Sequence, residues 1–301
     1  MPRLPFGRVL GPPMTIVLFI VVGFLASTGR LTFLNAILNR ETAAISIPAG
    51  EDPEVSLSLD QYDPASSVRL ATFNLQRYGE SKLQDELAIQ RIAWIIRQFD
   101  LVAIQEITWK TDAPLEPLIQ LINSAGRSYR YALSERLGGD DDKAYKEQYA
   151  FIWDSERLGL VEGSAYVVDD SEKLMSREPF VASFQSLPST SGGKPFRFTL
   201  INVHTTPKAV EQELNVLDDV YRSVRAFEQP EDDIILLGDL NVEREDFGEL
   251  GQLPGIETLN KTVTNTAGTR TIDHIAVDRF ATTEFRGAGV INLQSDLQLS
   301  R

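Results

Sequence analysis

The sequence contains no cysteine and only two histidines, His204 and His274. The absence of cysteine excludes disulfide bonds and thiol chemistry, and it is compatible with an oxidising compartment. Basic residues are also scarce, since 29 Lys and Arg stand against 43 Asp and Glu, a formal net charge of −14. Charge alone therefore does not indicate a nucleic-acid binder, although a bound divalent metal would reverse the local sign.

Long apolar runs are absent beyond the N-terminus, where residues 14–26 form an apolar core of 13 residues behind Arg3 and Arg8. This length is typical of a signal peptide and short for a spanning helix. Residues 1–30 are therefore predicted to be a signal peptide or an uncleaved anchor, with residues 12–29 in the membrane in the second case. Either way, the rest of the protein is expected to be exported, to the periplasm or the extracellular space.

Composition divides the remaining chain into a linker and one large domain. Residues 31–66 contain several prolines, acids and serines and are predicted to be a linker. Residues 67–301 are predicted to form the domain, which is long enough to bury a sizeable core.

Hydrophobic patterns predict more strands than helices in this domain. Helices are expected at residues 83–99, 115–125 and 210–224, because apolar residues recur there with helical spacing. Strands are expected at 68–75, 101–104, 129–133, 148–153, 158–168, 180–187, 196–203, 234–237 and 271–277.

Several apolar strands end in a polar residue that could serve chemistry. Taken one at a time, each such residue has an ordinary explanation as a turn former or a solvated strand end. Together they would converge on one site if the strands pack side by side. Carboxylate and amide oxygens suit a hard divalent cation, and histidine can exchange a proton near neutral pH. The strand-end residues are Asn74, Glu106, His204, Asp239 and Asn241.

Seven short motifs then appear in an order that resembles the endonuclease/exonuclease/phosphatase superfamily, and most closely its deoxyribonuclease I branch. The resemblance covers about residues 66 to 295. The motifs lie at residues 68–79, 101–107, 144–151, 176–179 (SREP), 202–207 (NVHTTP), 237–241 (LGDLN) and 271–275 (TIDHI).

The resemblance implies a four-layer α/β sandwich, with two packed, mainly antiparallel β-sheets flanked by helices. It also implies Mg²⁺-dependent phosphodiester hydrolysis, with Mn²⁺ as an alternative cation. In this family pattern Glu106 is the principal metal ligand, and Asn74 and Asp239 support the metal.

The resemblance also implies catalytic and substrate-binding roles. His204 would be a general acid/base oriented by Glu147, and Asn241 together with the metal-site Asp239 would hold phosphate or the attacking water. Arg177 would contact a substrate phosphate, and Tyr145 would pack against a nucleic-acid backbone. Asp273 matches the acid that orients a second catalytic histidine.

The family pattern is broken at the C-terminus. The usual final Ser-Asp-His strand is expected to be missing, since Ser295 and Asp296 lie in a polar stretch and no third histidine follows. His274 cannot easily replace it, because it follows Asp273 directly in a strand and points to the opposite face. Losing one acid/base group typically costs about 10²–10⁴ in rate.

Other departures bear on the substrate. Gln76 and Thr108 stand where the nuclease branch favours arginine, although Arg77 is adjacent. The acidic loop at residues 138–142 would repel a duplex unless it binds a structural Ca²⁺. These features weaken the case for tight DNA binding.

Three hypotheses follow. The first is an exported deoxyribonuclease I-like endonuclease acting on DNA or another phosphodiester. The second is a phosphomonoesterase or phospholipid phosphodiesterase on the same fold, which a membrane anchor would suit. The third is an inactive, truncated remnant. No protein partner is inferred from the sequence.

Overall fold

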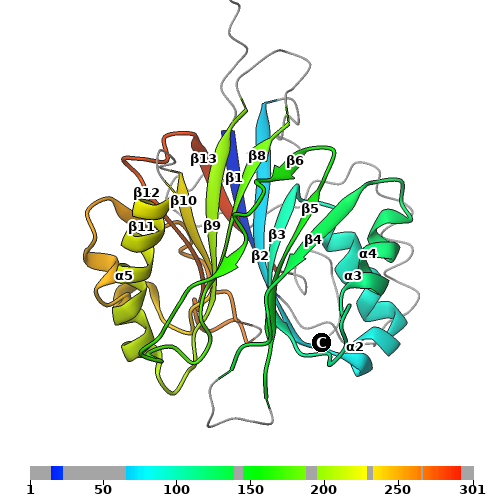
Figure 1. The fold of residues 1–301 in the computed structure, drawn as a ribbon, viewed down its shortest axis with the longest axis horizontal. Coiled ribbons are helices and arrows are strands. Elements are labelled where there is room, and N and C mark those ends of the chain that lie inside the picture. Colours follow the sequence, from blue (N-terminus) through cyan, green and yellow to red (C-terminus); the bar gives the residue numbers. More distant parts are fainter. Residues whose placement is uncertain are drawn as a thin grey trace, which may run out of the picture.

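A computed structural model describes residues 15–22, 66–138, 145–187, 195–228, 233–265 and 267–292. Two β-sheets pack face to face, and helices cover the outer face of each (Figure 1). This is the expected four-layer α/β sandwich. Most of the linker, most of the acidic loop at 138–142, and Ser295 and Asp296 lie outside the described residues.

The first sheet has six strands and mixed directions. Three neighbouring pairs, β13–β1, β1–β2 and β2–β3, are parallel, and the other two are antiparallel. The expectation of a mainly antiparallel sheet is therefore wrong here. The β2–α3–β3 crossover makes one parallel pair, and β1 lies parallel to both β2 and β13. In spatial order the strands are β13 (Phe285–Asn292), β1 (Thr15–Val22), β2 (Ser67–Tyr78), β3 (Leu101–Ile107), β5 (Gln148–Asp154) and β4 (Tyr129–Leu133).

The second sheet is mainly antiparallel, as expected, with a single parallel pair between β9 and β10 among its described strands. Strand β10 is buried along its whole length, which explains the continuous apolar run in the sequence. In spatial order the strands are β11 (Ile256–Thr258), β12 (Asp273–Asp278), β10 (Ile234–Asp239), β9 (Arg197–His204), β8 (Phe180–Ser186) and β6 (Leu158–Leu160), with β7 (Tyr166–Val167) also paired to β8.

Helices α2 (Glu80–Gln84), α3 (Glu86–Ile96) and α4 (Glu116–Asn123) lie along the first sheet, and α5 (Val210–Phe227) lies along the second (Figure 1). The helix expected at 83–99 is two helices, because the side chain of Asp85 accepts a hydrogen bond from the Ala88 N–H and starts α3. Two short 3₁₀ turns follow β10, at Arg244–Asp246 and Leu250–Gln252.

The strand expected at 158–168 is also interrupted. Gly163 adopts a φ of 75° between β6 and β7, a left-handed conformation that glycine adopts without steric cost. Ser164 secures the turn by donating its hydroxyl to Val161 O at 2.8 Å. The single strand expected from the sequence is therefore two short ones.

The apolar core has three layers that match the sandwich. The middle layer lies between the sheets and contains a stacked pair, Phe151 and Phe180, with ring centroids 5.2 Å apart. The outer layers join α3 and α4 to the first sheet and α5 to the second. Fully burying a side chain of this size contributes roughly 1.5–3 kcal/mol.

The N-terminal apolar segment is a strand in this structure. Residues Thr15–Val22 form β1, which pairs in parallel with β2 on one side and β13 on the other. The segment is rich in β-branched residues, which favour extended chain. No helix within the described residues is long and apolar enough to cross a bilayer.

A buried polar bridge joins the two sheets at one end of the sandwich. Gln105 on β3 donates its amide to Asn202 Oδ1 on β9 at 2.7 Å, and both side chains are fully buried. Asn202 in turn donates to the carbonyls of Ile104 and Ala150. Hydrogen bonds between buried amides fix the position of one sheet on the other, which places the ends of β3 and β9 next to each other.

Candidate active site

The strand-end residues do converge, at the edge where β2, β3, β9 and β10 finish. Asp239 pairs in register with His204 on one side and with Asp273 on the other. Asn74 approaches Asp239 from the other sheet. This edge therefore collects polar groups from both sheets.

Asn74 connects the two carboxylates of this edge. Its Nδ2 donates to Glu106 Oε1 at 2.9 Å and to Asp239 Oδ2 at 3.1 Å. The Glu106 side chain is 17% exposed, whereas Asp239 is almost completely buried. Two acidic groups and a carboxamide thus lie within contact of one another, with one carboxylate open to solvent.

His204 and Glu147 form a buried hydrogen-bonded pair. His204 Nδ1 lies 2.6 Å from Glu147 Oε1, and the second ring nitrogen, Nε2, lies 4.0 Å from Glu106 Oε1. Glu147 is fully buried and also contacts the guanidinium of Arg177 at 3.2 Å. The carboxylate therefore fixes the ring so that Nε2 is directed toward the Asn74–Glu106–Asp239 group.

These contacts shift the pKa of both partners. Burial lowers the pKa of His204, but the hydrogen bond and charge of Glu147 outweigh it, so the net pKa lies above the ordinary value. Burial raises the pKa of Glu147, yet His204 and Arg177 bring it below its ordinary value. Both shifts favour the imidazolium–carboxylate form of the pair.

This arrangement predicts distinct titrations for the two histidines. His204 is expected to titrate above about 6.5, and its pKa should fall in Glu147→Gln. His274 should titrate below that value, because burial lowers its pKa. The ring signals of two histidines in an NMR titration would measure both. Identical midpoints, or an unchanged His204 in the variant, would contradict the prediction.

The same pair makes stability depend on pH. The His204 pKa is raised on folding, so its contribution is full below about 6.5 and is lost as pH rises through the folded value. The Glu147 pKa is lowered, so its contribution is full above about 4.3 and is lost as pH falls through the folded value. The pair therefore stabilises most between these limits.

Tyr145 lies between the two carboxylates. Its hydroxyl is 3.1 Å from Glu147 Oε2 and 3.3 Å from Glu106 Oε2. Burial and the two carboxylates raise the pKa of this phenol well above its ordinary value. The guanidinium of Arg77 lies over the Tyr145 ring, 5.4 Å from its centroid, so an exposed cation is held beside the carboxylates.

Arg177 is buried beneath the site. Its Nε donates to the His204 carbonyl oxygen at 3.0 Å and also faces Glu147. The resemblance implies a contact with substrate phosphate at this position, and that role stays a prediction. The contacts that the structure shows are those that hold the histidine pair in place.

The residues after Asp239 lie beside it. The Asn241 backbone N–H donates to Asp239 Oδ1 at 3.1 Å, and the Asn241 side-chain amide donates to Thr205 O.

The other neighbours of Asp239 lie on β12. Burial and the charge of Asp239 raise the pKa of Asp273 well above its ordinary value. His274 points to the other face, as expected, where Nε2 lies 2.7 Å from Val242 O.

Arg77 and Lys82 both adjoin Glu106, and neither was predicted from the sequence to belong to the site. A hollow of about 520 Å³ beside Glu106 is lined partly by Gln76, Arg77 and Lys82. Gln76, Arg77 and Glu106 all have positive φ values, of 50°, 60° and 62°. Positive φ values depend on the folded backbone, and at positions that are not glycine they leave no reliable mark in the sequence.

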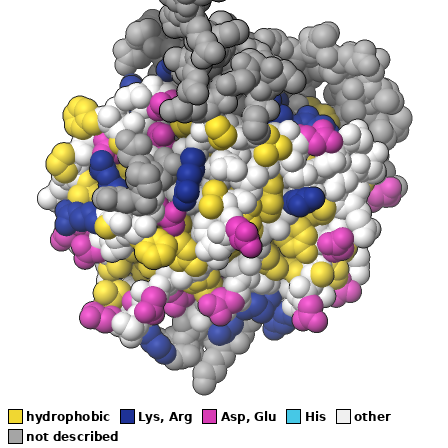
Figure 2. All heavy atoms as spheres, turned by 45° about the horizontal axis from the view of Figure 1, so that its top comes forward, with side chains coloured by type: hydrophobic (Ala, Val, Ile, Leu, Met, Phe, Trp, Pro, Cys, Tyr) yellow, Lys and Arg dark blue, Asp and Glu magenta, His cyan; other side chains and the backbone are white. Residues whose placement is uncertain are grey.

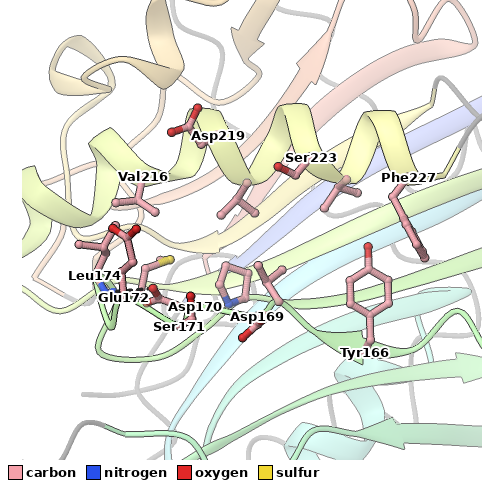
Figure 3. A pocket seen from close by; sticks show the side chains of 15 residues that line it. Tyr166, Asp169, Asp170, Ser171, Glu172, Leu174, Val216, Asp219, Ser223 and Phe227 are labelled. Atoms are coloured by element: carbon pink, nitrogen blue, oxygen red, sulfur yellow. Dashed lines mark hydrogen bonds between the residues drawn. The ribbon is translucent and has the colours of Figure 1, made fainter.

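A second groove, of about 550 Å³, lies away from this chemistry. Figure 3 shows Val216, Ser223 and Phe227 on α5 opposite Tyr166 on β7. The rings of Tyr166 and Phe227 meet edge to face at 5.7 Å. None of the residues implicated in acid/base or metal chemistry lines this groove.

The surface charge is mixed where it can be seen. Figure 2 shows lysines and arginines scattered among acidic and apolar side chains on one face. This pattern agrees with the acidic composition and shows no broad basic patch on that face.

The side-chain oxygens of Asn74, Glu106 and Asp239 are of the kind that binds a hard divalent cation. Within the described part of the chain, no group of three or more His, Cys, Asp or Glu side chains is arranged to hold a metal. Mg²⁺ does not need one, because it keeps several waters and is usually bound through one or two carboxylates. Burial, together with the charge of Glu106, raises the pKa of Asp239, and a cation would relieve that repulsion.

The fold and the polar residues at the ends of β2, β3, β9 and β10 define a class of protein. It is a four-layer α/β sandwich with a hydrolase-type site. The histidine–carboxylate pair can exchange a proton, and the neighbouring oxygens can hold a hard cation. The chain belongs to the Endonuclease/Exonuclease/phosphatase family, whose model matches residues 71–296.

Relatives within the family include deoxyribonucleases. The chain is 35% identical over 183 residues to deoxyribonuclease-1-like 1 of Cricetulus griseus, covering 59% of this chain and 56% of that protein. It is 35% identical over 182 residues to deoxyribonuclease gamma of Rattus norvegicus, with 59% and 56% covered. The chain thus spans a little over half the length of these curated relatives.

The chain has distant structural similarity to several solved structures. A crystal structure of an endonuclease/exonuclease/phosphatase family protein from Bacteroides thetaiotaomicron is 18% identical, with a TM-score of 0.46 over 69% of this chain and 82% of that chain. The human Nocturnin catalytic domain gives 14% identity and a TM-score of 0.43, over 64% and 75%.

Proposed function

We propose that this protein is a metal-dependent phosphodiester hydrolase of the deoxyribonuclease I type, acting as an endonuclease on DNA. The observation that carries the proposal is the His204–Glu147 pair directed at the Asn74–Glu106–Asp239 group. The identity to deoxyribonucleases supports DNA as the substrate class.

The side chains of the site supply proton transfer and hold the reacting groups in position. Attack of water on phosphorus forms one P–O bond, and the bond to the leaving oxygen breaks. Imidazolium His204 donates the Nε2 proton to that oxygen, while Glu147 keeps the ring oriented. Asp239 accepts a hydrogen bond from the attacking water and takes the proton that the water loses, and Asn241 donates a hydrogen bond to a phosphate oxygen.

Glu106 would hold Mg²⁺ or Mn²⁺, with Asn74 and Asp239 in support. When bound, the cation neutralises charge on the phosphate and makes the attacking water more acidic. A structural Ca²⁺ at residues 138–142 also remains a proposal, as do export and anchoring by the N-terminal segment.

Plasmid nicking by the full chain tests the proposed function. Nicking that requires Mg²⁺ and stops with chelator is the expected result. A soluble, folded protein that leaves plasmid intact at all Mg²⁺ and Mn²⁺ concentrations would contradict the endonuclease proposal. Cleavage of only a phosphomonoester or a phospholipid would instead place the substrate elsewhere in the family.

Arg77 is expected to contact a substrate phosphate, because it is exposed and held over Tyr145 beside the site. Arg77→Ala should raise KM for DNA roughly threefold to tenfold and reduce the salt slope of binding by about one. Arg130→Ala, another exposed arginine on β4, is the matched control and should change neither. Equal KM values and equal salt slopes for the two variants would contradict the assignment.

A further inference from the structure

A strained bulge lies directly behind the proposed metal site. After Asn74, strand β2 leaves the ladder, and it rejoins β3 only where Tyr78 pairs with Ile107. Gln76 and Arg77 within the bulge both adopt left-handed backbone conformations. Side chains other than glycine rarely do so, and such conformations persist only where neighbouring contacts hold them.

Two backbone N–H groups of the bulge donate hydrogen bonds to the side chains of the proposed metal ligands. The Gln76 N–H donates to Asn74 Oδ1 at 2.8 Å, and the Arg77 N–H donates to Glu106 Oε2 at 2.9 Å. Each hydrogen bond orients one side chain of the donor set. The positions of the Asn74 and Glu106 oxygens therefore depend on the shape of the bulge.

Lys82 secures the outer side of the same bulge. Helix α2 turns back after Gly79, so that the Lys82 ammonium donates to the carbonyl oxygens of Leu75 and Gln76. Burial lowers the pKa of this lysine, and the nearby Glu106 carboxylate opposes that shift. One side chain thus satisfies two carbonyls that the bulge removes from the β-ladder.

We propose that Lys82 is a positioning residue that sets the divalent-cation affinity of the Asn74–Glu106 site. It acts through the backbone of the bulge and does not itself bind the metal. The inference rests on the proposed function, because it assigns the cation to Glu106. It adds a residue of helix α2 to the determinants of that site.

Two effects of Lys82 on metal binding have opposite signs. Its positive charge near Glu106 disfavours a cation, so charge removal alone would tighten binding. Its hydrogen bonds hold the ligands in place, and their loss should weaken binding. Residues that orient metal ligands typically contribute about 10- to 100-fold in affinity. The opposing charge effect is limited, because the half-buried Lys82 ammonium already interacts with two carbonyl oxygens. The positioning effect should therefore dominate.

Mn²⁺ binding to the full chain, measured by titration calorimetry on folded protein, tests the proposal without relying on activity. Lys82→Met should bind Mn²⁺ about 10- to 100-fold more weakly than the wild type. Lys110→Met, at an exposed lysine after β3, should bind as the wild type does. Affinity in Lys82→Met equal to or tighter than that of the wild type would overturn the proposal, even if the variant melts at a lower temperature.

Two further variants keep the outcomes distinct. Lys82→Gln, which drops the charge and shortens the reach, replaces Lys82→Met if that variant does not fold, and the same outcomes apply to it. Glu106→Gln should lose Mn²⁺ binding. If the wild type does not bind Mn²⁺, or Glu106→Gln binds it normally, the metal assignment fails and this inference fails with it. Loss in Glu106→Gln with no change at Lys82 overturns the Lys82 inference alone.

Discussion

Replacing His204 with asparagine is expected to lower the turnover number for phosphodiester cleavage by about 10²- to 10⁴-fold, the usual contribution of a positioned acid/base group. Glu147 raises the pKa of His204, which favours the protonated ring that can donate to the leaving oxygen. Asparagine can still reach Glu147 but cannot donate a proton to the leaving oxygen. The measurement is the kcat for plasmid nicking at saturating Mg²⁺ and at several pH values.

The second histidine provides the control for this experiment. His274 is fully buried on the opposite face of β12 and packs against Phe247 at 4.7 Å between ring centroids. His274→Asn should lower the melting temperature and leave kcat of the folded protein close to that of the wild type. If His204→Asn and His274→Asn lowered kcat equally, the loss would reflect stability, and the catalytic assignment of His204 would be wrong.

Glu106→Gln is expected to abolish stimulation of cleavage by Mg²⁺. Glutamine has the same shape and keeps one acceptor oxygen, so it can accept the hydrogen bond from Asn74 or the one from the Arg77 N–H. It lacks the negative charge that a hard cation requires from a site with so few carboxylates. Cleavage rates across a Mg²⁺ titration, with the melting temperature as a check on folding, provide the measurement.

Glu162→Gln provides the matched substitution, because Glu162 is exposed in the turn between β6 and β7. It should keep the Mg²⁺ response of the wild type. A Glu106→Gln protein with a normal Mg²⁺ response would place the cation elsewhere, and Asp239 would then be the next carboxylate to replace.

The arrangement around Arg177 changes how loss of this residue should be interpreted. The sequence resemblance pointed to a substrate phosphate, yet the structure shows the guanidinium against Glu147 and the His204 carbonyl. Removing Arg177 would leave the buried Glu147 carboxylate with one fewer cation nearby. A loss of activity in an Arg177 variant would therefore report on the His204–Glu147 pair as well as on substrate binding.

Much of the secondary structure could be predicted from local patterns. Apolar runs marked β3 and β10, and 3.6-residue spacing marked α5, because burial leaves a periodic trace in the sequence. The interruptions were missed. Asp85 ends one helix and caps the next, and Gly163 turns the chain between β6 and β7, but a single capping or turn residue is a weak signal inside a longer apolar pattern.

The sequence by itself determined the family, the four-layer architecture and the set of polar strand ends, because these depend on residue type and order along the chain. The resemblance implied that Glu147 orients His204 and that Asn74 and Asp239 serve one metal, and the tertiary structure supplied the contacts themselves, across 57 positions and 165 positions. Only the folded backbone revealed the left-handed bulge that Lys82 secures behind Glu106. Distances between strands and the sign of φ depend on how the two sheets pack, which local sequence patterns do not encode.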